Sequence, residues 1–555
     1  MTRVIRQGAA VLAVGAAVAV GVVGAQQTAA DIILTNGKII TVDDTFTIAQ
    51  AVAIRGDRFL AVGGNDEVSR LAGPNTRRID LRGRAVVPGF IDNHAHFMEE
   101  GAYWQLELRL DGVDSRARAL EMIRERARSH GPGAWVFTLG GWSPDQFADD
   151  PRPFTRDELD QYAPDNPVFL QFTREQTYLN SRAIEAVGLD AIREPWVARD
   201  ASGRPTGVIE GDAGAAQVRN AAGFLRNLPK DIFESSSFKM LRDLNAAGLT
   251  SSGGGCQYED IYRQWQRQGR LTMRFFCLRT APGGGRGGNL DQLIAAIPKV
   301  RYFDGDEWID HVNWGERVIN TPDTVNDTRP TAPPELWAQW GRVARELARA
   351  GVPIFIHSTM EWTIEEQLRQ VEAIAKEIPI RHLRWGFKHM EGVTPAQIER
   401  MRRLGMYIGV HPRAVISGAA FIRRHGEKGY SMPPLKAIQD SGIMWGFGTD
   451  AFEVNQYRPF TTLWWAVTGK MVGGRVVNRH PIGREDALVA YTRRNAFFFF
   501  RENDLGSIQP GKLADLVVLD RDYLTIPADQ IKDINVVMTM VGGRIVYEAG
   551  AAATR

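Results

Sequence analysis

Between about residue 88 and residue 503, short apolar runs of the β type alternate with segments of helical periodicity, such as 334–350 and 363–376. This alternation favours parallel βαβ units, because each helix returns the chain to the start of the next parallel strand. It predicts an α/β fold, a (β/α)8 TIM barrel. The runs that qualify as strands outnumber the eight of a barrel, and they are 85–87, 135–139, 168–170, 273–276, 309–312, 352–356, 385–387, 406–410 and 443–447.

The surplus is explained if part of the chain is an insertion. Residues 140 to about 211 are rich in Asp, Pro and Arg and predict such an insertion within a barrel domain that spans 88–503.

Short strands separated by glycine turns occupy both 31–87 and 504–555. Either piece alone would leave open edges and a thin core, so we expect one small β-sandwich domain built from both chain ends.

The N-terminus has the pattern of a signal peptide. Arg3 and Arg6 precede an apolar run of about 15 residues that ends in Gly24-Ala25, and a polar segment follows. The run is shorter than the roughly 20 residues of a membrane-spanning helix. We expect residues 1–25 to be removed and the mature protein to be exported to the periplasm without a membrane span; an uncleaved anchor is the alternative.

Composition excludes some classes of partner. The formal net charge of +2 gives no support for nucleic-acid binding.

The chain has two cysteines, Cys256 and Cys277, and neither belongs to a CxxC or to a zinc-finger spacing. We interpret both as buried thiols, although one bridge between them is the alternative.

The strongest local motif runs from Val86 to His96, where an apolar strand leads directly into His-x-His. Residues two apart on a strand point to the same side, so the imidazoles of His94 and His96 can reach one ion. The active sites of (β/α)8 barrels are built at the carboxyl ends of their strands, which is where this motif is predicted to lie. The motif therefore predicts a metal site.

Three further residues close apolar runs in the same way: His357 after 352–356, His389 after 385–388 and Asp450 after 445–449. Taken singly, each is better explained as a buried histidine with satisfied hydrogen bonds or as a helix-capping aspartate. Because the same placement recurs at several strand ends, we interpret these residues and the His-x-His pair as one metal site.

A set of short segments carries a family resemblance: 88–96, 140–142, 205–208, 247–250, 389–391, 448–450 and 506–516. On these segments the sequence resembles the amidohydrolase superfamily, in particular the branch that includes N-substituted formamide deformylases. The resemblance covers nearly the whole chain after the N-terminal segment. It implies a barrel flanked by a β-sandwich made from both chain ends.

The resemblance also implies roles for individual residues. His94, His96 and His357 become metal ligands, Asp450 a ligand or general base, and His389 a second ligand or a substrate-polarising group. Neutral imidazoles hold a divalent ion that lowers the pKa of bound water, and a carboxylate beside it can take the proton and return it to a leaving amine. Imidazole and carboxylate ligands suit zinc, and iron, manganese, cobalt and nickel are the alternatives for the same geometry. The ion would also stabilise the oxyanion of the tetrahedral intermediate.

The sequence departs from the family pattern at two places. Many relatives carry a carbamylated lysine that bridges two metals, and the corresponding segment 311–316 here has Asn313 instead. This departure predicts a single ion, with Glu316 as a less favoured substitute bridge. The second departure is 172–180, where relatives often have Asp-Gly-His, so that substrate contacts from the insertion are expected to differ.

Aromatic residues near the predicted mouth, Trp142 and Trp314 among them, indicate a small apolar or aromatic substrate, although large barrels also bury many aromatic residues. Arg174 and Lys388 could meet an anionic group, while ion-pair roles are more common for such residues. We predict Trp142, Arg174 and Trp314 as substrate-binding residues.

The predicted activity is hydrolysis of a C–N bond in an amide, formamide or cyclic amide by metal-activated water. Deamination and the hydrolysis of an ester or lactone use the same machinery, and the choice among them is made by the pocket rather than by the ligands. A periplasmic binding protein without catalysis is a third alternative, but it predicts loss of the ligands, and all five are present. The two-ended β-domain also offers a surface for a homo-oligomer.

Overall fold

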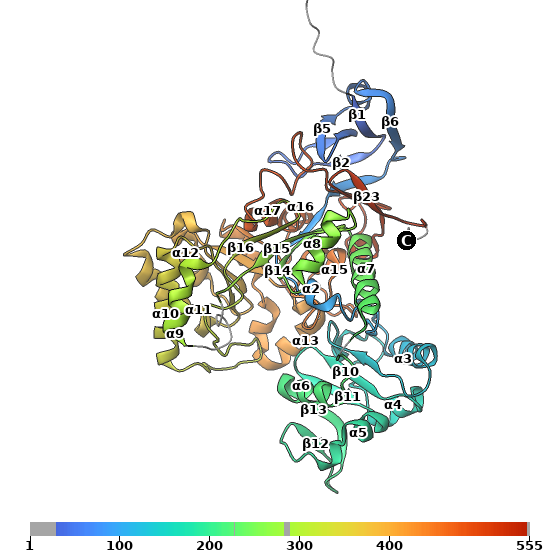
Figure 1. The fold of residues 1–555 in the computed structure, drawn as a ribbon, viewed down its shortest axis with the longest axis vertical. Coiled ribbons are helices and arrows are strands. Elements are labelled where there is room, and N and C mark those ends of the chain that lie inside the picture. The colour runs from blue at the N-terminus through green and yellow to red at the C-terminus, as the bar shows by residue number, and fades with distance from the viewer. Residues whose placement is uncertain (1–28, 227, 282–288, 552–555) are drawn as a thin grey trace, which may run out of the picture.

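This computed structural model describes residues 29–226, 228–281 and 289–551. The predicted signal segment 1–25 lies outside the described residues. Three modules are visible: one at the centre, one formed by the two chain ends, and one formed by the insertion below (Figure 1). Among the described residues, no helix is long and apolar enough to cross a membrane.

The central module contains eight parallel strands in two sheets, which makes the fold α/β. The first sheet has the order β16-β15-β14-β8 and the second β17-β18-β19-β20. A parallel bridge between Trp314 and Ile354 joins them at one edge. Hydrogen bonds from Asn93 N to Phe447 O (3.1 Å) and from Asp450 N to His94 O (2.8 Å) link the opposite edges. The strands are β8 (Phe90–Asp92), β14 (Leu249–Gly255), β15 (Arg274–Leu278), β16 (Ile309–Asn313), β17 (Phe355–Ser358), β18 (Gly386–His389), β19 (Tyr407–Val410) and β20 (Trp445–Phe447).

Helices follow most of the parallel strands, and several of them bury one face. The two helical patterns noted in the sequence form α10 (Pro334–Arg349) and α11 (Glu361–Ala375). Helix α10 buries Trp337, Trp340 and Leu347 on one side, in agreement with its apolar periodicity. Other helices of the central module include α7 (Lys230–Ala246), α8 (Glu259–Arg267), α9 (Leu290–Ala296), α12 (Pro395–Leu404), α13 (Ala414–His425) and α15 (Pro459–Thr468).

The strand prediction needs three corrections. Residues 85–87 belong to β7 (Ala85–Pro88), which pairs with chain-end strands, and β8 begins only after Gly89. Residues 135–139 and 168–170 belong to the insertion sheet rather than to the parallel strands. Strand β14 was not predicted because its sequence, LTSSGGG, has almost no apolar residues. Its glycines are required by close packing, since a Cβ at Gly254 would lie 1.9 Å from the Ala95 oxygen.

Strands from both chain ends share one sheet. The six-stranded sheet β23-β22-β21-β7-β2-β3 pairs β7 with β21 (Leu516–Leu519) in antiparallel register. A second sheet, β5-β4-β1-β6, comes from the N-terminal part alone. The remaining strands of these sheets are β1 (Ala30–Thr35), β2 (Lys38–Ile40), β3 (Ile48–Ala49), β4 (Ala51–Arg55), β5 (Arg58–Gly63), β6 (Ala72–Asp80), β22 (Val536–Val541) and β23 (Arg544–Glu548).

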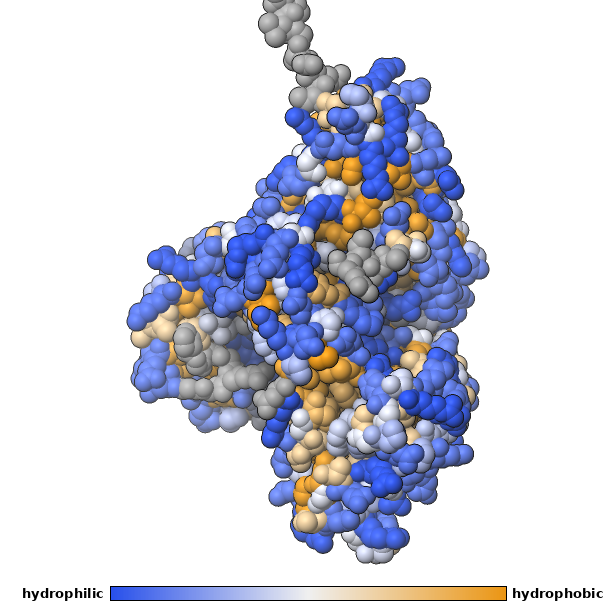
Figure 2. All heavy atoms as spheres, turned by 45° about the vertical axis from the view of Figure 1, so that its right-hand side comes forward, coloured by the Kyte–Doolittle hydropathy of each residue, from blue (hydrophilic) through white to orange (hydrophobic). Residues whose placement is uncertain are grey.

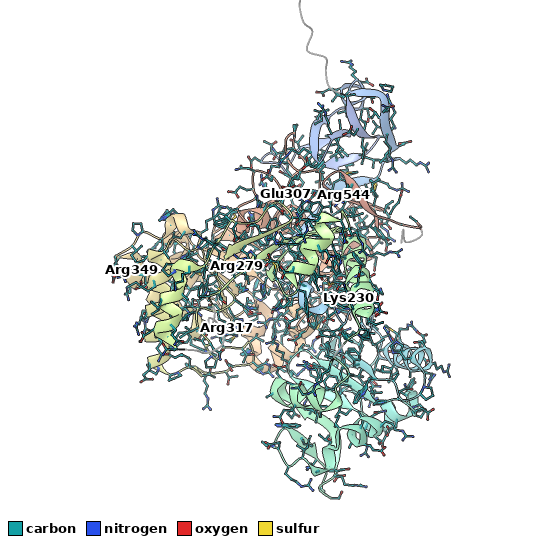
Figure 3. The ribbon with its side chains drawn as sticks, viewed as in Figure 1. Lys230, Arg279, Glu307, Arg317, Arg349 and Arg544 are labelled. Carbon is teal, nitrogen blue, oxygen red and sulfur yellow. A yellow bond between two sulfur atoms is a disulfide. The ribbon has the colours of Figure 1, made fainter. Side chains whose placement is uncertain are left out.

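A buried ion pair fastens the chain-end module to the central one. Arg274 on β15 donates from Nε and Nη2 to the two carboxylate oxygens of Asp515, at 2.9 and 3.0 Å. Its Nη1 donates to the carbonyl oxygen of Glu307 at 3.0 Å, and Glu307 is labelled near Arg544 in Figure 3. Asp515 also accepts from Gly542 N at 2.7 Å. Both charged groups therefore have their hydrogen bonds satisfied within the protein.

The insertion forms a mixed sheet in the order β12-β13-β11-β10-β9. It includes β9 (Val136–Thr138), so the elements that pack together begin before residue 140. The other strands are β10 (Val168–Phe172), β11 (Gln176–Leu179), β12 (Val197–Arg199) and β13 (Pro205–Glu210), and the flanking helices are α3 (Arg116–His130), α4 (Arg156–Tyr162), α5 (Ser181–Val187) and α6 (Gly211–Ala222).

The insertion is attached to the central module near α13. The Ser143 hydroxyl donates to Ile416 O, and Arg423 pairs with Asp145 at 2.7 Å. Figure 2 shows a mostly hydrophilic face with a strip of hydrophobic atoms that runs from the centre toward this module.

The interpretation of both cysteines as thiols was wrong: Cys256 and Cys277 form a disulfide with Cα atoms 5.6 Å apart. Cys256 follows β14 directly, and Cys277 lies on its neighbour β15. Sequence spacing did not reveal the bridge because the proximity comes from pairing of the two strands.

Candidate metal centre

The His-x-His pair follows β8 and is held by the strands on either side. Ala95 N donates to Gly253 O at 2.8 Å. The buried Asp92 carboxylate accepts from His94 N at 3.0 Å and from the Thr449 hydroxyl at 2.6 Å. This carboxylate connects the loop of the histidines to the loop that carries Asp450.

The first cluster consists of His94, His96 and Asp450, with donor atoms within 4.8 Å of one another. The Asp450 Oδ1 atom lies 3.3 Å from Nε2 of each of the two histidines. His94 is buried, whereas a quarter of the His96 side chain is exposed. The cluster is therefore open to solvent on the His96 side.

The second cluster consists of Glu316, His357 and His389. The Glu316 Oε1 atom lies 2.9 Å from His357 Nδ1 and 3.0 Å from His389 Nε2. The same oxygen is 3.9 Å from Nε2 of His94 in the first cluster. One carboxylate oxygen thus faces histidines of both clusters.

Hydrogen bonds fix the orientation of His357. Its Nε2 lies 3.1 Å from the carbonyl oxygen of Asp323, so Nε2–H donates there and Nδ1 is left facing Glu316. The Asp323 carboxylate in turn accepts from the Thr359 amide and hydroxyl at 2.7 and 2.6 Å. Partners of this kind orient a ligating imidazole and select its tautomer.

Sequence analysis did not identify His411, and it named Lys388 only as a possible contact for an anionic group. His411 follows β19, and its Nδ1 is 2.8 Å from Nδ1 of His389; together with Asp450 these two histidines form a third group of neighbouring donor atoms. Lys388 is fully buried, with Nζ 2.9 Å from His94 Nδ1. The strand-end rule that found His389 would also have found His411, because 406–410 was already predicted as a strand.

The electrostatics favour neutral His94, His357 and His389 and charged carboxylates. At His96 burial by itself would lower the pKa, but the Asp450 carboxylate raises it above the usual value. Burial lowers the pKa of His94 to about 3, and the Lys388 charge adds to the effect. Burial also lowers the pKa of Lys388, to about 8. Burial by itself would raise the pKa values of Glu316 and Asp450. The nearby charge of Lys388 is the largest effect that lowers the pKa of Glu316, and His389 is the largest for Asp450. Both pKa values therefore lie well below the usual range. Neutral imidazoles beside ionised carboxylates are the form that binds a divalent ion.

The predicted substrate-binding residues differ in their accessibility. Trp142 is fully buried in the insertion core, and its Nε1 donates to Thr138 Oγ1 at 3.0 Å. Trp314 is also fully buried, with Nε1 donating to Arg317 O at 3.0 Å. In this structure neither indole has a free surface for a substrate, because each fills a core.

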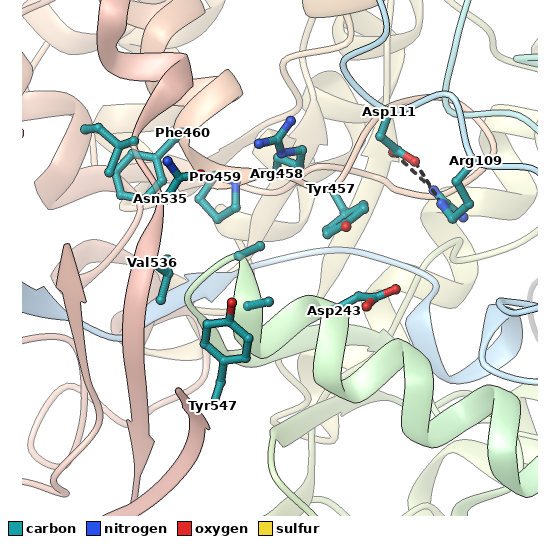
Figure 4. Close-up of a pocket in the computed structure, with 13 residues that line it drawn as sticks. Arg109, Asp111, Asp243, Tyr457, Arg458, Pro459, Phe460, Asn535, Val536 and Tyr547 are labelled. Atoms are coloured by element: carbon teal, nitrogen blue, oxygen red, sulfur yellow. Dashed lines mark hydrogen bonds and ion pairs between the residues drawn. The ribbon is translucent and has the colours of Figure 1, made fainter. Parts of the chain in front are cut away.

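Arg174 is half exposed and pairs with Glu453 at 2.5 Å. It lines a cavity of about 550 Å³ between the insertion and α13, together with Phe172, Tyr178 and Arg424. A separate pocket of about 390 Å³ lies where Arg109, Asp243, Tyr457 and Tyr547 meet, and none of the metal-centre residues lines it (Figure 4).

A family model described as "Amidohydrolase family" matches residues 77–547. The chain is 27% identical to the N-substituted formamide deformylase of Arthrobacter pascens, over 93% of this chain and 98% of that protein. It is 24% identical to the putative amidohydrolase YtcJ of Bacillus subtilis, over 92% of this chain and 98% of that protein. An uncharacterized metal-dependent hydrolase from Pyrococcus furiosus has a similar fold, with a TM-score of 0.61 at 22% identity over 89% of this chain and 100% of that one.

Proposed function

The chain belongs to the amidohydrolase family and is a metal-dependent hydrolase that acts on C–N bonds, and from this premise we propose that it hydrolyses N-substituted formamides and related small amides. The observation that carries the proposal is the position of Glu316, whose Oε1 faces His357 and His389 at 2.9 and 3.0 Å and His94 at 3.9 Å. The substrate class follows the similarity to the formamide deformylase.

We propose two divalent ions rather than one. His94, His96 and Asp450 would hold the first, His357 and His389 the second, and Glu316 would bridge them. The donors at each cluster fit a divalent ion, because their atoms lie within 4.8 Å of one another and combine imidazole with carboxylate, which suits zinc. The single ion predicted from Asn313 assumed that only a lysine on β16 could bridge; Glu316, three residues later, supplies the alternative carboxylate.

Bound ions supply Lewis acidity, which lowers the pKa of water and stabilises negative charge on the amide oxygen. The chain's own residues handle the proton. Asp450 Oδ1 faces the His-x-His pair, and its Oδ2, 3.5 Å from His389 Nδ1 and 3.8 Å from His411 Nδ1, would take the proton of the attacking water. As the oxygen–carbon bond forms and the C–N bond breaks, the same Oδ2 returns the proton to the leaving amine. The products are a carboxylic acid and an amine.

The architecture extends this proposal. We infer that the eight parallel strands close into a (β/α)8 barrel of residues 88–503, and that the two chain-end sheets form a β-sandwich from 31–87 and 504–555. The links at both sheet edges support closure. The chain-end strands that share one sheet support the two-ended module.

Export to the periplasm after removal of residues 1–25 is also part of the proposal. Its structural support is the Cys256–Cys277 disulfide, because disulfides persist in oxidising compartments. Edman sequencing of the protein recovered from the periplasm should start near Gln26; recovery of the full-length chain from the cytoplasm would contradict export.

Elemental analysis of zinc-loaded, desalted protein tests the metal centre. We expect two ions per chain in the wild type, at most one in Glu316→Gln, and two in His480→Ala, which removes an exposed histidine that belongs to neither cluster. A parallel screen of N-substituted formamides should release formate and the amine.

Two results would contradict the proposal. A wild-type chain that binds one ion, unchanged in Glu316→Gln, would remove the bridge and restore the single-ion prediction. Amide hydrolysis that persists at the full rate after chelation has stripped the ions from the protein would remove the metal-dependent mechanism.

A further inference from the structure

Arg413 lies where the metal-centre residues lie, just after the carboxyl end of a parallel strand. It follows β19 by three residues and precedes α13. Its side chain is 9% exposed, and it pairs with Glu391, which follows β18 and is fully buried. A buried guanidinium beside a catalytic centre requires an explanation, because arginine is rarely buried without a set of partners.

The pair leaves hydrogen-bonding capacity unused. Arg413 Nε donates to Glu391 Oε1 at 2.6 Å, and Nη2 lies 2.5 Å from the same oxygen. Both nitrogens therefore crowd one oxygen. Among the described residues, Nη2 of Arg413 and Oε2 of Glu391 make no hydrogen bond, although both atoms are buried. A guanidinium is matched by a carboxylate that meets its fork with two oxygens, which Glu391 does not do here.

The unpaired donor, Nη2 of Arg413, is on a side chain that is influenced by the charges around the metal centre. The charges of Asp450 and Asp323 both act on Arg413 and favour its charged form. His411, two residues before it, stacks on His94 with ring centroids 5.1 Å apart and also has a buried nitrogen, Nε2, without a hydrogen bond among the described residues. Open polar atoms thus lie on two side chains of the short segment between β19 and α13, and one of these side chains, His411, stacks on a histidine of the first cluster.

We propose that Arg413 determines substrate specificity by binding a carboxylate of the substrate, with Glu391 as the positioning residue that holds the guanidinium. The inference rests on the proposed function and narrows it to amides that carry a carboxylate, such as N-formyl amino acids. Arg174 is a weaker candidate for this role, because more than half of its side chain is exposed and an ion pair with a substrate would be screened by water there. Replacement of arginine by lysine loses the fork geometry, so the two are not equivalent here.

A matched substrate pair tests the proposal on the zinc-loaded enzyme. N-Formylphenylalanine and N-(2-phenylethyl)formamide share the formamide and the ring and differ by the carboxylate. We expect wild-type kcat/KM to favour the carboxylate by about 10- to 100-fold. Arg413→Gln should abolish the preference, mainly through a higher KM for N-formylphenylalanine, and should lower kcat/KM for the neutral formamide far less. Glu391→Gln should reduce the preference in part, and Arg475→Gln, an exposed control, should preserve it.

Binding of 3-phenylpropanoate, measured by calorimetry, gives a readout without turnover. We expect its affinity to fall at least about tenfold in Arg413→Gln. If Arg413→Gln is too unstable to purify, Arg413→Lys keeps the charge, and it should still lose most of the preference. Equal preference in wild type and variants, or unchanged affinity for 3-phenylpropanoate, would overturn the role of Arg413. Failure to hydrolyse either formamide, with 3-phenylpropanoate still sensitive to Arg413, would instead overturn the proposed function.

Discussion

Asp515→Asn should destabilise the protein strongly, because it removes the charge that compensates a buried guanidinium. Arg274 is 1% exposed and Asp515 5% exposed, and two hydrogen bonds of 2.9 and 3.0 Å join them. Asparagine keeps the volume and one acceptor but leaves the Arg274 charge without its counter-ion. Removal of one partner from a buried pair costs about 3–5 kcal/mol.

The cost converts into a measurable change in melting temperature. An unfolding entropy of about 2 cal/mol/K per residue gives about 1 kcal/mol/K for roughly 500 folded residues, so Tm should fall by about 3–5 °C. Calorimetry or circular dichroism measures the shift. Arg274→Met combined with Asp515→Asn should lose less than the two single changes together, because no uncompensated charge then remains.

An exposed ion pair provides the control. Arg342 and Asp291 lie 2.6 Å apart with side chains 57% and 75% exposed. Asp291→Asn should change the stability by less than about 1 kcal/mol. If Asp515→Asn melts within about 1 °C of Asp291→Asn, the argument from buried charge is refuted.

Three further changes test other parts of the structure. Replacement of Cys256 and Cys277 by serine should lower the free energy of unfolding by about 3 kcal/mol, because the bridge closes a loop with a sequence separation of 21. In urea, the wild type treated with reductant should unfold with the same free energy as this double variant. Gly254→Ala should lower the bound metal measured by elemental analysis, since its Cβ would meet the Ala95 oxygen at 1.9 Å between the two histidines; unchanged metal would contradict that close approach. Burial would raise the pKa of Glu158, but a neighbouring arginine and threonine hold it at about 2, so this carboxylate adds stability above pH 4.5 that is lost as the pH falls toward 2. Glu158→Gln should therefore be less stable than the wild type at pH 7, and urea titrations in which the gap does not narrow in acid would disprove the assignment.

The sequence by itself determined the α/β class and the places where the candidate metal ligands would lie. Alternating apolar and helical periods depend on local backbone geometry, so they are readable along the chain. The His-x-His spacing and the residues after three apolar runs identified five side chains, and the structure brings all five into two neighbouring clusters. The returning chain-end strands were also recognisable from their short length and glycine turns.

The tertiary structure alone decided how those side chains are combined. Glu316 approaches His94 from a distant part of the chain, and no spacing rule encodes such an approach. From the sequence, Trp142 and Trp314 were predicted to contact the substrate, but tertiary packing buries both indoles in hydrophobic cores. Pairing of β14 with β15 likewise brings Cys256 and Cys277 close enough to form a disulfide, which their sequence spacing did not indicate. Local patterns fix which residues end a strand, whereas the paths of loops and the pairing of distant strands fix which of those residues meet.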